Sequence, residues 1–217
     1  MPTFLFYLFT ILGAYLFGSI PWGYLIGRLY GKDIRKLGSG NIGATNVTRS
    51  IGKLPGRLCF ALDALKGFLP VFAVSQLLRH QLCSDPWGWI QIAALAGSVG
   101  GHMFSCFLHF KGGKGISTAA GAVLALSPYA VLIAAAVWLI AFLAWRYVSL
   151  ASIAAAAALP LSATIIDAYH LYPHSNVTLG GFYLLSLAAI LKHLSNLKRL
   201  LNGTENRFQK KSKTPEK

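Results

Sequence analysis

The sequence predicts an all-α, polytopic integral membrane protein, and three observations support this fold class. Hydrophobic residues make up 55% of the 217 residues and charged residues only 12%, whereas a typical soluble domain carries about 25% charged residues. The mean hydropathy is +0.55. Several apolar windows approach or exceed the ~18–20 residues that cross a bilayer as a helix. These windows are blocks of Ala, Leu and Ile, without the alternation of a transmembrane β-strand.

Seven apolar segments follow one another along the chain. They cover residues 4–26, 54–78, 87–108, 115–126, 129–145, 148–167 and 179–195. We therefore expect about seven transmembrane helices in a single domain that spans 1–217. Segment 115–126 is too short to cross the membrane upright. It could be a tilted helix, a half-helix or part of one long helix that ends at Trp145, so an arrangement with five spans stays open.

The positive charge is distributed as expected for a membrane protein. The sequence has 20 Lys and Arg against 6 Asp and Glu, a net charge of +14. The first apolar segment has no charged residue before it and four cations after it, at Arg28, Lys32, Arg35 and Lys36. This bias places the N-terminus outside and the C-terminus in the cytoplasm. All basic residues except Lys66 and Arg79 then lie on the cytoplasmic side.

We expect a membrane-lipid partner and no nucleic acid, because topology explains the basic excess. The basic tail at about 207–217 is predicted to be disordered and to be attracted to anionic headgroups.

The polar stretch from Gly38 to Arg49 reads GSGNIGATNVTR and lies between two apolar segments. Glycines let backbone N–H groups turn toward an anion, and short hydroxyl and amide side chains add donors. The guanidinium at the end is suited to phosphate. This pattern predicts a loop that binds a phosphorylated substrate rather than a helix-packing stripe. Its candidate ligands are Ser39, Gly40, Asn41, Gly43, Thr45, Asn46 and Arg49.

A second polar motif is Gly112-Gly113-Lys114-Gly115. Gly112 and Gly113 would let the backbone approach a ligand, while the Lys114 ammonium meets its negative charge. The spacing does not fit a nucleotide-binding P-loop. Alternatively, Lys114 is only a topology charge.

Two further candidates lie at predicted cytoplasmic turns. His193 and Asn196 share one helix face, where they could hydrogen-bond a polyol or a phosphate. Ser149 follows Arg146 at another turn. The cytoplasmic side has few carboxylates and no HExxH or Ser-His-Asp pattern. We therefore expect no metal and no cofactor, and a substrate that is already activated by its own phosphate.

Three polar residues fall inside apolar segments. Asp63 and Lys66 are three residues apart, so they most simply form an ion pair in the membrane. The alternative is an indirect role in positioning a loop. For His102, a buried structural hydrogen bond and a role in the site are equally open.

The chain resembles the bacterial acyl-phosphate:glycerol-3-phosphate acyltransferases over its whole length. The resemblance is carried by Gly18–Pro21, Gly38–Arg49, Leu62–Gly67, Gly101–His102, Lys111–Gly115, Arg146–Ser149, Asn196, Lys198–Leu201 and Gly203–Glu205. It implies seven helices in the bacterial inner membrane with the active site at the cytoplasmic face. The implied reaction transfers a fatty acyl group from acyl phosphate to the 1-hydroxyl of glycerol 3-phosphate. Its products are lysophosphatidic acid and phosphate, in the first acylation of phospholipid biosynthesis.

The resemblance also implies roles for particular residues. Residues at the positions of Ser39, Thr45, Arg49 and Lys114 are associated with phosphate binding, and those at Ser149, His193 and Asn196 with the glycerol phosphate pocket. We therefore expect Lys114, Arg49 and Ser149 to be catalytic. The donor phosphate is thought to assist deprotonation of the acceptor hydroxyl. Two positions depart from the family pattern: Ser105 replaces a common proline, and Leu194 replaces a common arginine.

A transporter and a membrane scaffold are the alternatives to this interpretation. A transporter of organic anions or phosphate would also collect cations, but its site should lie near the bilayer midplane between repeated halves, and no internal repeat is visible. A membrane scaffold would leave the glycine-framed cations unexplained. The sequence leaves the oligomeric state open, and a monomer is plausible.

Overall fold

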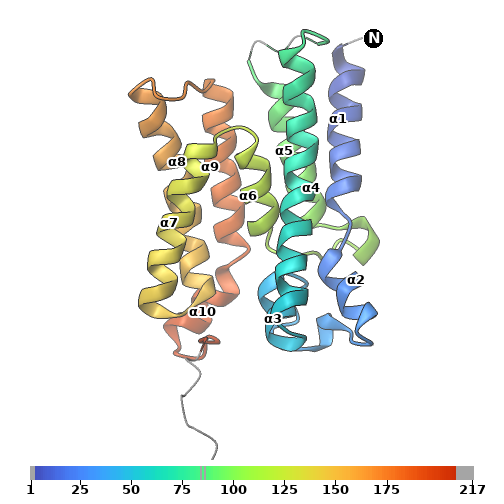
Figure 1. The fold of residues 1–217 in the computed structure, drawn as a ribbon, viewed down its shortest axis with the longest axis vertical. Coiled ribbons are helices and arrows are strands. Elements are labelled where there is room, and N and C mark those ends of the chain that lie inside the picture. The colour runs from blue at the N-terminus through green and yellow to red at the C-terminus, as the bar shows by residue number, and fades with distance from the viewer. Residues whose placement is uncertain (1–2, 84, 86, 209–217) are drawn as a thin grey trace, which may run out of the picture.

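The computed structural model describes residues 3–83, 85 and 87–208, and all regular secondary structure in these ranges is helical (Figure 1). The α-helices are α1 (Thr3–Gly18), α2 (Trp22–Leu29), α3 (Ala44–Ser50), α4 (Lys53–Arg79), α5 (Trp89–Met103), α6 (Ile116–Leu124), α7 (Pro128–Trp145), α8 (Val148–Ala168), α9 (Asn176–Leu191) and α10 (Leu194–Leu201). Two short 3₁₀ helices, η1 (Ile34–Lys36) and η2 (Cys106–Leu108), lie in the connecting loops.

Five of the described helical segments are long and apolar enough to cross a membrane. These are Phe4–Leu29, Lys53–Arg79, Trp89–Leu108, Pro128–Trp145 and Val148–Ala168. A sixth is obtained if α9 and α10, which are bent by 52° relative to each other, count as one span. The prediction of an all-α, multi-pass membrane protein is thus confirmed. Helix α6 has only 9 residues, about 14 Å of helix, against a hydrocarbon core of about 30 Å.

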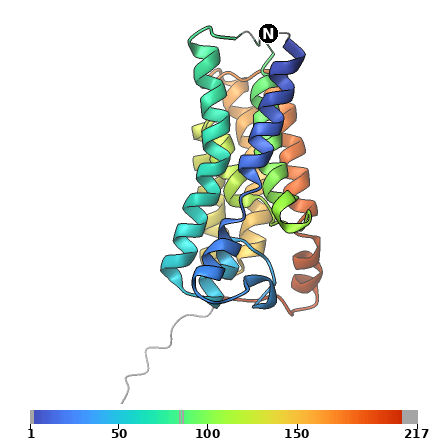
Figure 2. The same cartoon turned by 90° about the vertical axis from the view of Figure 1, so that its right-hand side faces the viewer.

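The helices run mostly along one long axis, and the N-terminus lies at one end of the bundle (Figures 1 and 2). Helices α2, α3 and α10 lie together at the opposite end, as Figure 1 shows. Helix α1 packs on α5, α7 on α8, and α8 on α9. Helix α6 contacts α4 and α5 on one side and α7 and α9 on the other, so it connects the two halves of the bundle.

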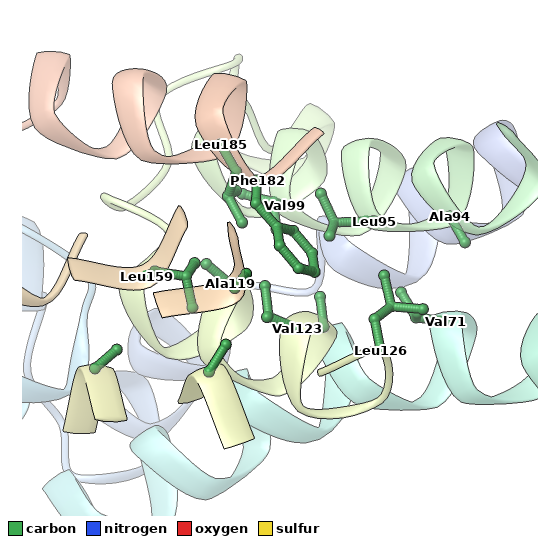
Figure 3. Close-up of a cluster of buried hydrophobic side chains, with 14 of the residues drawn as sticks. Val71, Ala94, Leu95, Val99, Ala119, Val123, Leu126, Leu159, Phe182 and Leu185 are labelled. Carbon is green, nitrogen blue, oxygen red and sulfur yellow. The ribbon is translucent and has the colours of Figure 1, made fainter. Parts of the chain in front are cut away.

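Small residues allow α6 to lie against α4. A Cβ atom at Gly67 would overlap the carbonyl oxygen of Thr118, and one at Gly121 would overlap the carbonyl oxygen of Ala64. Such close backbone approach is typical of helix packing in membranes, where van der Waals contact replaces a hydrophobic driving force. The apolar core next to this crossing contains Phe182, whose ring is fully buried beside Val99 and Val123 (Figure 3).

The first span is interrupted between α1 and α2, at Ser19–Pro21. The interruption frees backbone carbonyls, which must find donors inside a membrane. Ser105 Oγ donates to the carbonyl of Ser19 at 2.6 Å, and Lys66 Nζ donates to the carbonyl of Ile20 at 2.6 Å. Ser105, which departs from the family pattern, therefore supplies a hydrogen bond that proline could not make.

The chain is ordered slightly further than the sequence indicates. The Phe208 N–H donates to the carbonyl of Arg146 at 3.0 Å, and its ring lies edge-on to Phe142 with 5.8 Å between centroids. Phe208, in the tail predicted to be disordered at 207–217, therefore lies against α7 and the residue that follows it. The rest of that prediction concerns residues 209–217, which lie outside the described residues.

Candidate active site

A polar cavity of about 160 Å³ lies where the four predicted polar motifs meet. Of the predicted site residues, those that line it are Ser39, Asn41, Gly43, Thr45, Asn46, Arg49, Lys114, Ser149, His193 and Asn196. The structure thus brings together residues from α3, α8, α10 and the loops before α3, α6 and α10. Gly40, Gly112 and Gly113 are not among the lining residues.

The first polar loop is held in shape by Asn46. Its side chain is 2% exposed, and its Nδ2 donates to the carbonyls of Ile34, Leu37 and Asn41 at 3.1, 2.9 and 2.8 Å. Its Oδ1 accepts the Ser39 N–H at 3.1 Å. Both polar ends of the amide are therefore engaged in the loop itself. Asn46 supports the loop and does not offer its side chain to a ligand, in contrast to our expectation.

Three of the backbone N–H groups that were expected to meet an anion are engaged within the loop itself. The Gly40 N–H donates to the carbonyl of Leu37 at 2.9 Å. The Gly43 N–H donates to Asn41 Oδ1 at 2.8 Å, and the Asn46 N–H to the carbonyl of Gly43 at 3.0 Å. Gly40 is instead required for its positive φ of +70°, a region that favours glycine. These three N–H groups are therefore not free to bind an anion.

The two glycines before Lys114 serve packing rather than ligand contact. A Cβ at Gly112 would overlap the carbonyl oxygen of His102, and one at Gly113 would overlap the His102 imidazole. The Gly113 N–H donates to the His102 carbonyl at 3.0 Å. Glycine is needed here because the loop lies directly on the end of α5, which corrects our expectation that both glycines bind substrate.

A hydrogen-bond network around Glu205 fixes the opposite wall of the cavity. Ser149 Oγ and Asn196 Nδ2 both donate to Glu205 Oε1 at 2.8 Å, and Arg199 Nε donates to Oε2 at 2.8 Å. Burial alone would raise the pKa of Glu205, but these three donors hold it below its ordinary value. The Asn196 amide oxygen is left to accept from Lys114 Nζ. Glu205 therefore orients Ser149 and Asn196, and through Asn196 it also reaches Lys114.

His193 presents an acceptor to the same cavity. Its side chain is buried, and Nδ1 lies 2.8 Å from the carbonyl oxygen of Ala189. Because a carbonyl can only accept, Nδ1 carries the proton in the neutral ring and Nε2 is an acceptor. His193 can thus accept a hydrogen bond from a hydroxyl group of a ligand.

Arg49 and Lys114 are cations without an acidic partner. Among the residues that the structure describes, no carboxylate lies within 4.0 Å of either. The Arg49 guanidinium lies over the Phe208 ring, 5.0 Å from its centroid. Burial lowers the pKa of Arg49 and lowers the pKa of Lys114 to about 8. Neither cation thus has a carboxylate partner, and a bound anion could take that place.

An apolar groove of about 500 Å³ opens beside the polar cavity. The two share a wall formed by Ala44, Thr45, Phe60, Ile116, Trp138, Val148 and Ser152. Beyond this wall the groove follows α6, α7, α8 and α9, where its lining is mostly Ala, Val, Leu and Phe side chains, and it also reaches Thr48 of α3 and Arg57 of α4. A ligand that fits both spaces would combine an anionic head with a long apolar chain.

Comparisons with known proteins agree with this geometry. Residues 8–203 match the family described as glycerol-3-phosphate acyltransferase. The chain is 49% identical to the glycerol-3-phosphate acyltransferase of Trichlorobacter lovleyi, over 93% of this chain and 97% of the relative. It is 44% identical to that of Aquifex aeolicus, over 93% and 98%.

Two solved structures are similar over nearly the whole chain. Both are crystal structures of PlsY, an integral membrane glycerol 3-phosphate acyltransferase, one in the glycerol 3-phosphate form and one in the lysophosphatidic acid form. Each is 42% identical to this chain and covers 94% of it, with TM-scores of 0.82 and 0.79 and coverage of 96% and 95% of the solved chains. The chain belongs to the glycerol-3-phosphate acyltransferase family.

As a glycerol-3-phosphate acyltransferase of this type, the protein is an enzyme of phospholipid synthesis whose product is lysophosphatidic acid. The family assignment excludes the transporter and the scaffold that the sequence had left as alternatives. A glycerol-3-phosphate acyltransferase needs a polar pocket for its acceptor and an apolar space for an acyl chain, and the two adjoining cavities meet both needs.

Sequence reasoning missed several lining residues of this acyltransferase. They are Phe60, Trp138, Ser152, Arg199 and Glu205. Glu205 carried a usable signal, because it is an isolated carboxylate in a basic segment. Its three donors come from α8 and α10, however, and their approach to Glu205 depends on the fold. Among the described residues, no group of three or more His, Cys, Asp or Glu side chains could hold a metal ion.

Proposed function

We propose that the acyl donor is an acyl phosphate and that the acceptor is the 1-hydroxyl of glycerol 3-phosphate. The observation that carries this proposal is the pair of cations without acidic partners, Arg49 and Lys114, in a polar cavity that adjoins an apolar groove. Two phosphates would bring the missing negative charge, and the acyl chain would occupy the groove.

The two cations act together in this mechanism. Arg49 and Lys114 orient the two phosphates and stabilise the negative charge that develops as the hydroxyl oxygen attacks the acyl carbonyl. Ser39, Asn41 and Thr45 add side-chain donors from the first loop.

The acceptor is held by the other wall of the cavity. Ser149, His193 and Asn196 hydrogen-bond the glycerol phosphate, with Glu205 keeping Ser149 and Asn196 in place. The attacking oxygen forms the new ester bond as the bond between the acyl carbon and the phosphate oxygen breaks. Inorganic phosphate leaves.

The proton of the attacking hydroxyl goes to the leaving phosphate. Both carboxylates that line the described cavity are already engaged, since Asp63 pairs with Lys66 at 2.9 Å and Glu205 accepts three hydrogen bonds. This supports a substrate that carries its own base, as acyl phosphate does and a thioester does not.

We further propose that the cavity faces the cytoplasm of a bacterial cell. We also propose that α6 is a short membrane segment that brings the total to seven. Helices α3 and α10, which contribute Arg49 and Asn196 to the cavity, lie at the end of the bundle opposite the N-terminus (Figure 1), and α10 also carries Lys198 and Arg199. This arrangement obeys the positive-inside rule. A cysteine introduced at Lys111 should react with an impermeant reagent only after the cells are opened. Labelling of intact cells would overturn the orientation.

The experiment supplies purified enzyme with labelled glycerol 3-phosphate and either acyl phosphate or acyl-CoA. Lysophosphatidic acid should form with acyl phosphate alone, and product from acyl-CoA at a similar rate would refute the donor. Arg49→Ala and Lys114→Ala should each lower kcat/KM by at least about 100-fold, the scale of one transition-state donor. Lys111→Ala, which removes an exposed lysine outside the cavity, is the control. Near-normal turnover in both site variants would refute the cation pair.

A further inference from the structure

A buried polar cluster lies beside the active site and takes no part in the proposed reaction. It consists of Asp63 and Lys66 from α4 and His102 from α5, whose side chains are 2%, 1% and 4% exposed. Asp63 Oδ1 lies 2.9 Å from Lys66 Nζ and 3.5 Å from His102 Nδ1. Burying such groups in a membrane protein is costly, so their arrangement calls for an explanation beyond packing.

The cluster is anchored on one side to the interrupted first span. Lys66 Nζ pairs with Asp63 and also donates to the carbonyl of Ile20 at 2.6 Å. Asp63 is further approached by Cys59, whose Sγ lies 3.6 Å from Oδ2. The carboxylate is therefore fixed by its own helix and by the break between α1 and α2.

On its other side the cluster supports the loop that carries Lys114. The His102 carbonyl accepts the Gly113 N–H at 3.0 Å, and the imidazole fills the space that a side chain at Gly113 would need. His102 and Asp63 also reach the floor of the polar cavity. A continuous path of contacts thus leads from Ile20 through Lys66, Asp63 and His102 to the residue that precedes Lys114.

We propose that His102, oriented by Asp63, is a positioning residue that sets the place of the Lys114 ammonium in the active site. The inference rests on the role proposed above for Lys114. Lys114 follows Gly113 directly, so a displacement of the Gly112–Gly113 backbone moves the ammonium, and a misplacement of about 1 Å can cost about 100-fold in rate. The negative carboxylate and the positive Lys66 offset each other, so the cluster provides rigidity without adding net charge beside the substrate phosphates.

The first test asks whether His102 acts through Lys114. In a double-mutant cycle, His102→Ala should lower kcat/KM by about 30-fold in the wild-type background, but by less than about 3-fold when Lys114→Ala is already present. If the double variant instead loses the product of the two single fold-losses in kcat/KM, the inference is overturned. Near-normal activity of Lys114→Ala alone would instead refute the proposed function.

The second test uses the two glycines as steric probes. Gly113→Ala should lose about 100-fold in activity, because the three atoms nearest to its Cβ all belong to the His102 imidazole and would overlap it. Removing the imidazole with His102→Ala should relieve that overlap, so Gly113→Ala/His102→Ala should be no worse than His102→Ala alone. Gly112→Ala is the matched control, because its Cβ meets backbone atoms of His102 and Met103, and His102→Ala should not rescue it.

Each outcome of the second test decides the inference. Rescue of Gly113→Ala but not of Gly112→Ala supports it. Equal rescue of both, or of neither, overturns it. Melting temperatures of all variants are measured in the same detergent, since a purely structural His102 would lower stability without producing the dependence on Lys114.

Discussion

Replacing Lys114 with methionine should make the stability of the ligand-free enzyme less dependent on pH, and it should abolish the activity. Burial lowers the pKa of Lys114 from 10.5 to about 8, with Glu205 opposing this change and Arg199 adding to it. A difference of that size corresponds to at most ~3 kcal/mol. Solvent that reaches the cavity reduces this figure, and we expect about 1–2 kcal/mol. Methionine keeps most of the apolar stem and removes the charge.

The sign follows from proton linkage. The Lys114 pKa is lower in the folded protein, so the unfolded chain binds the proton more tightly between about pH 8 and pH 10.5. The free energy of unfolding of the wild type therefore rises with pH across this window. Below about pH 8 the penalty for the buried charge is complete, and above pH 10.5 it is absent. The Lys114→Met variant lacks this contribution at every pH.

The assay measures thermal unfolding of the detergent-solubilised enzyme from pH 7 to pH 10.5. The melting temperature of Lys114→Met minus that of the wild type should shrink by about 2–8 °C across this range, at ~2–4 °C per kcal/mol for a chain of this length. The lost hydrogen bond to Asn196 contributes equally at every pH, because a neutral amine also donates.

The control is Lys111→Met, which removes an exposed lysine from the same loop. Its melting temperature should keep a constant offset from the wild type. Inorganic phosphate should stabilise the wild type at pH 7 more than Lys114→Met, because only the wild type has the ammonium to bind it. A Lys114→Met difference that is independent of pH would refute the reasoning.

Four further predictions concern single residues. The kcat/KM of the wild type should fall above about pH 8 as Lys114 loses its proton, whereas Lys114→Arg, measured in the same pH series, should keep its lower activity up to pH 10. Glu205→Gln should lower kcat/KM for glycerol 3-phosphate by about 10–100-fold, or ~1.5–3 kcal/mol, because three donors lose their charged acceptor. Ser105→Ala should cost about 1–3 kcal/mol of stability in thermal unfolding, since it leaves a buried carbonyl at the α1–α2 break without its donor. Ala155→Phe should reduce turnover of long acyl phosphates more than of short ones by filling the apolar groove, whereas Ala136→Phe, outside the groove, should leave the chain-length profile unchanged.

The sequence predicted the parts of this protein that depend on local composition. Apolar length and the distribution of Lys and Arg sufficed for an all-α membrane fold. The same charge pattern assigned residues as distant as Arg49 and Asn196 to one face of the membrane, and the structure places both in one cavity. The number of spans was harder to predict, because α6 is apolar but short and α9 and α10 are bent.

The roles of the glycines and amides could not be read from the sequence. A glycine next to a lysine fits an anion loop and a tight packing contact equally well, and only the approach of α5 shows that Gly113 lies on His102. Likewise, Asn46 was a natural ligand candidate until three nearby carbonyls were seen to occupy its amide. The partner of Gly113 comes from a distant helix, whereas those of Asn46 come from the folded path of its own loop.

Two lysines of this chain, Lys66 and Lys114, differ in the partners that the protein gives to their ammonium groups. Lys66 lies in the membrane-spanning part with a carboxylate at 2.9 Å and a carbonyl at 2.6 Å, so its charge is satisfied within the protein and it can only support. Lys114 has an amide oxygen as its partner and no carboxylate within 4.0 Å among the described residues. A protein selected for stability alone would give Lys114 an acidic neighbour, but such a neighbour would occupy the place of the substrate phosphate. Under the proposed function, the ion pair that the free enzyme lacks at Lys114 forms when the substrate phosphate binds.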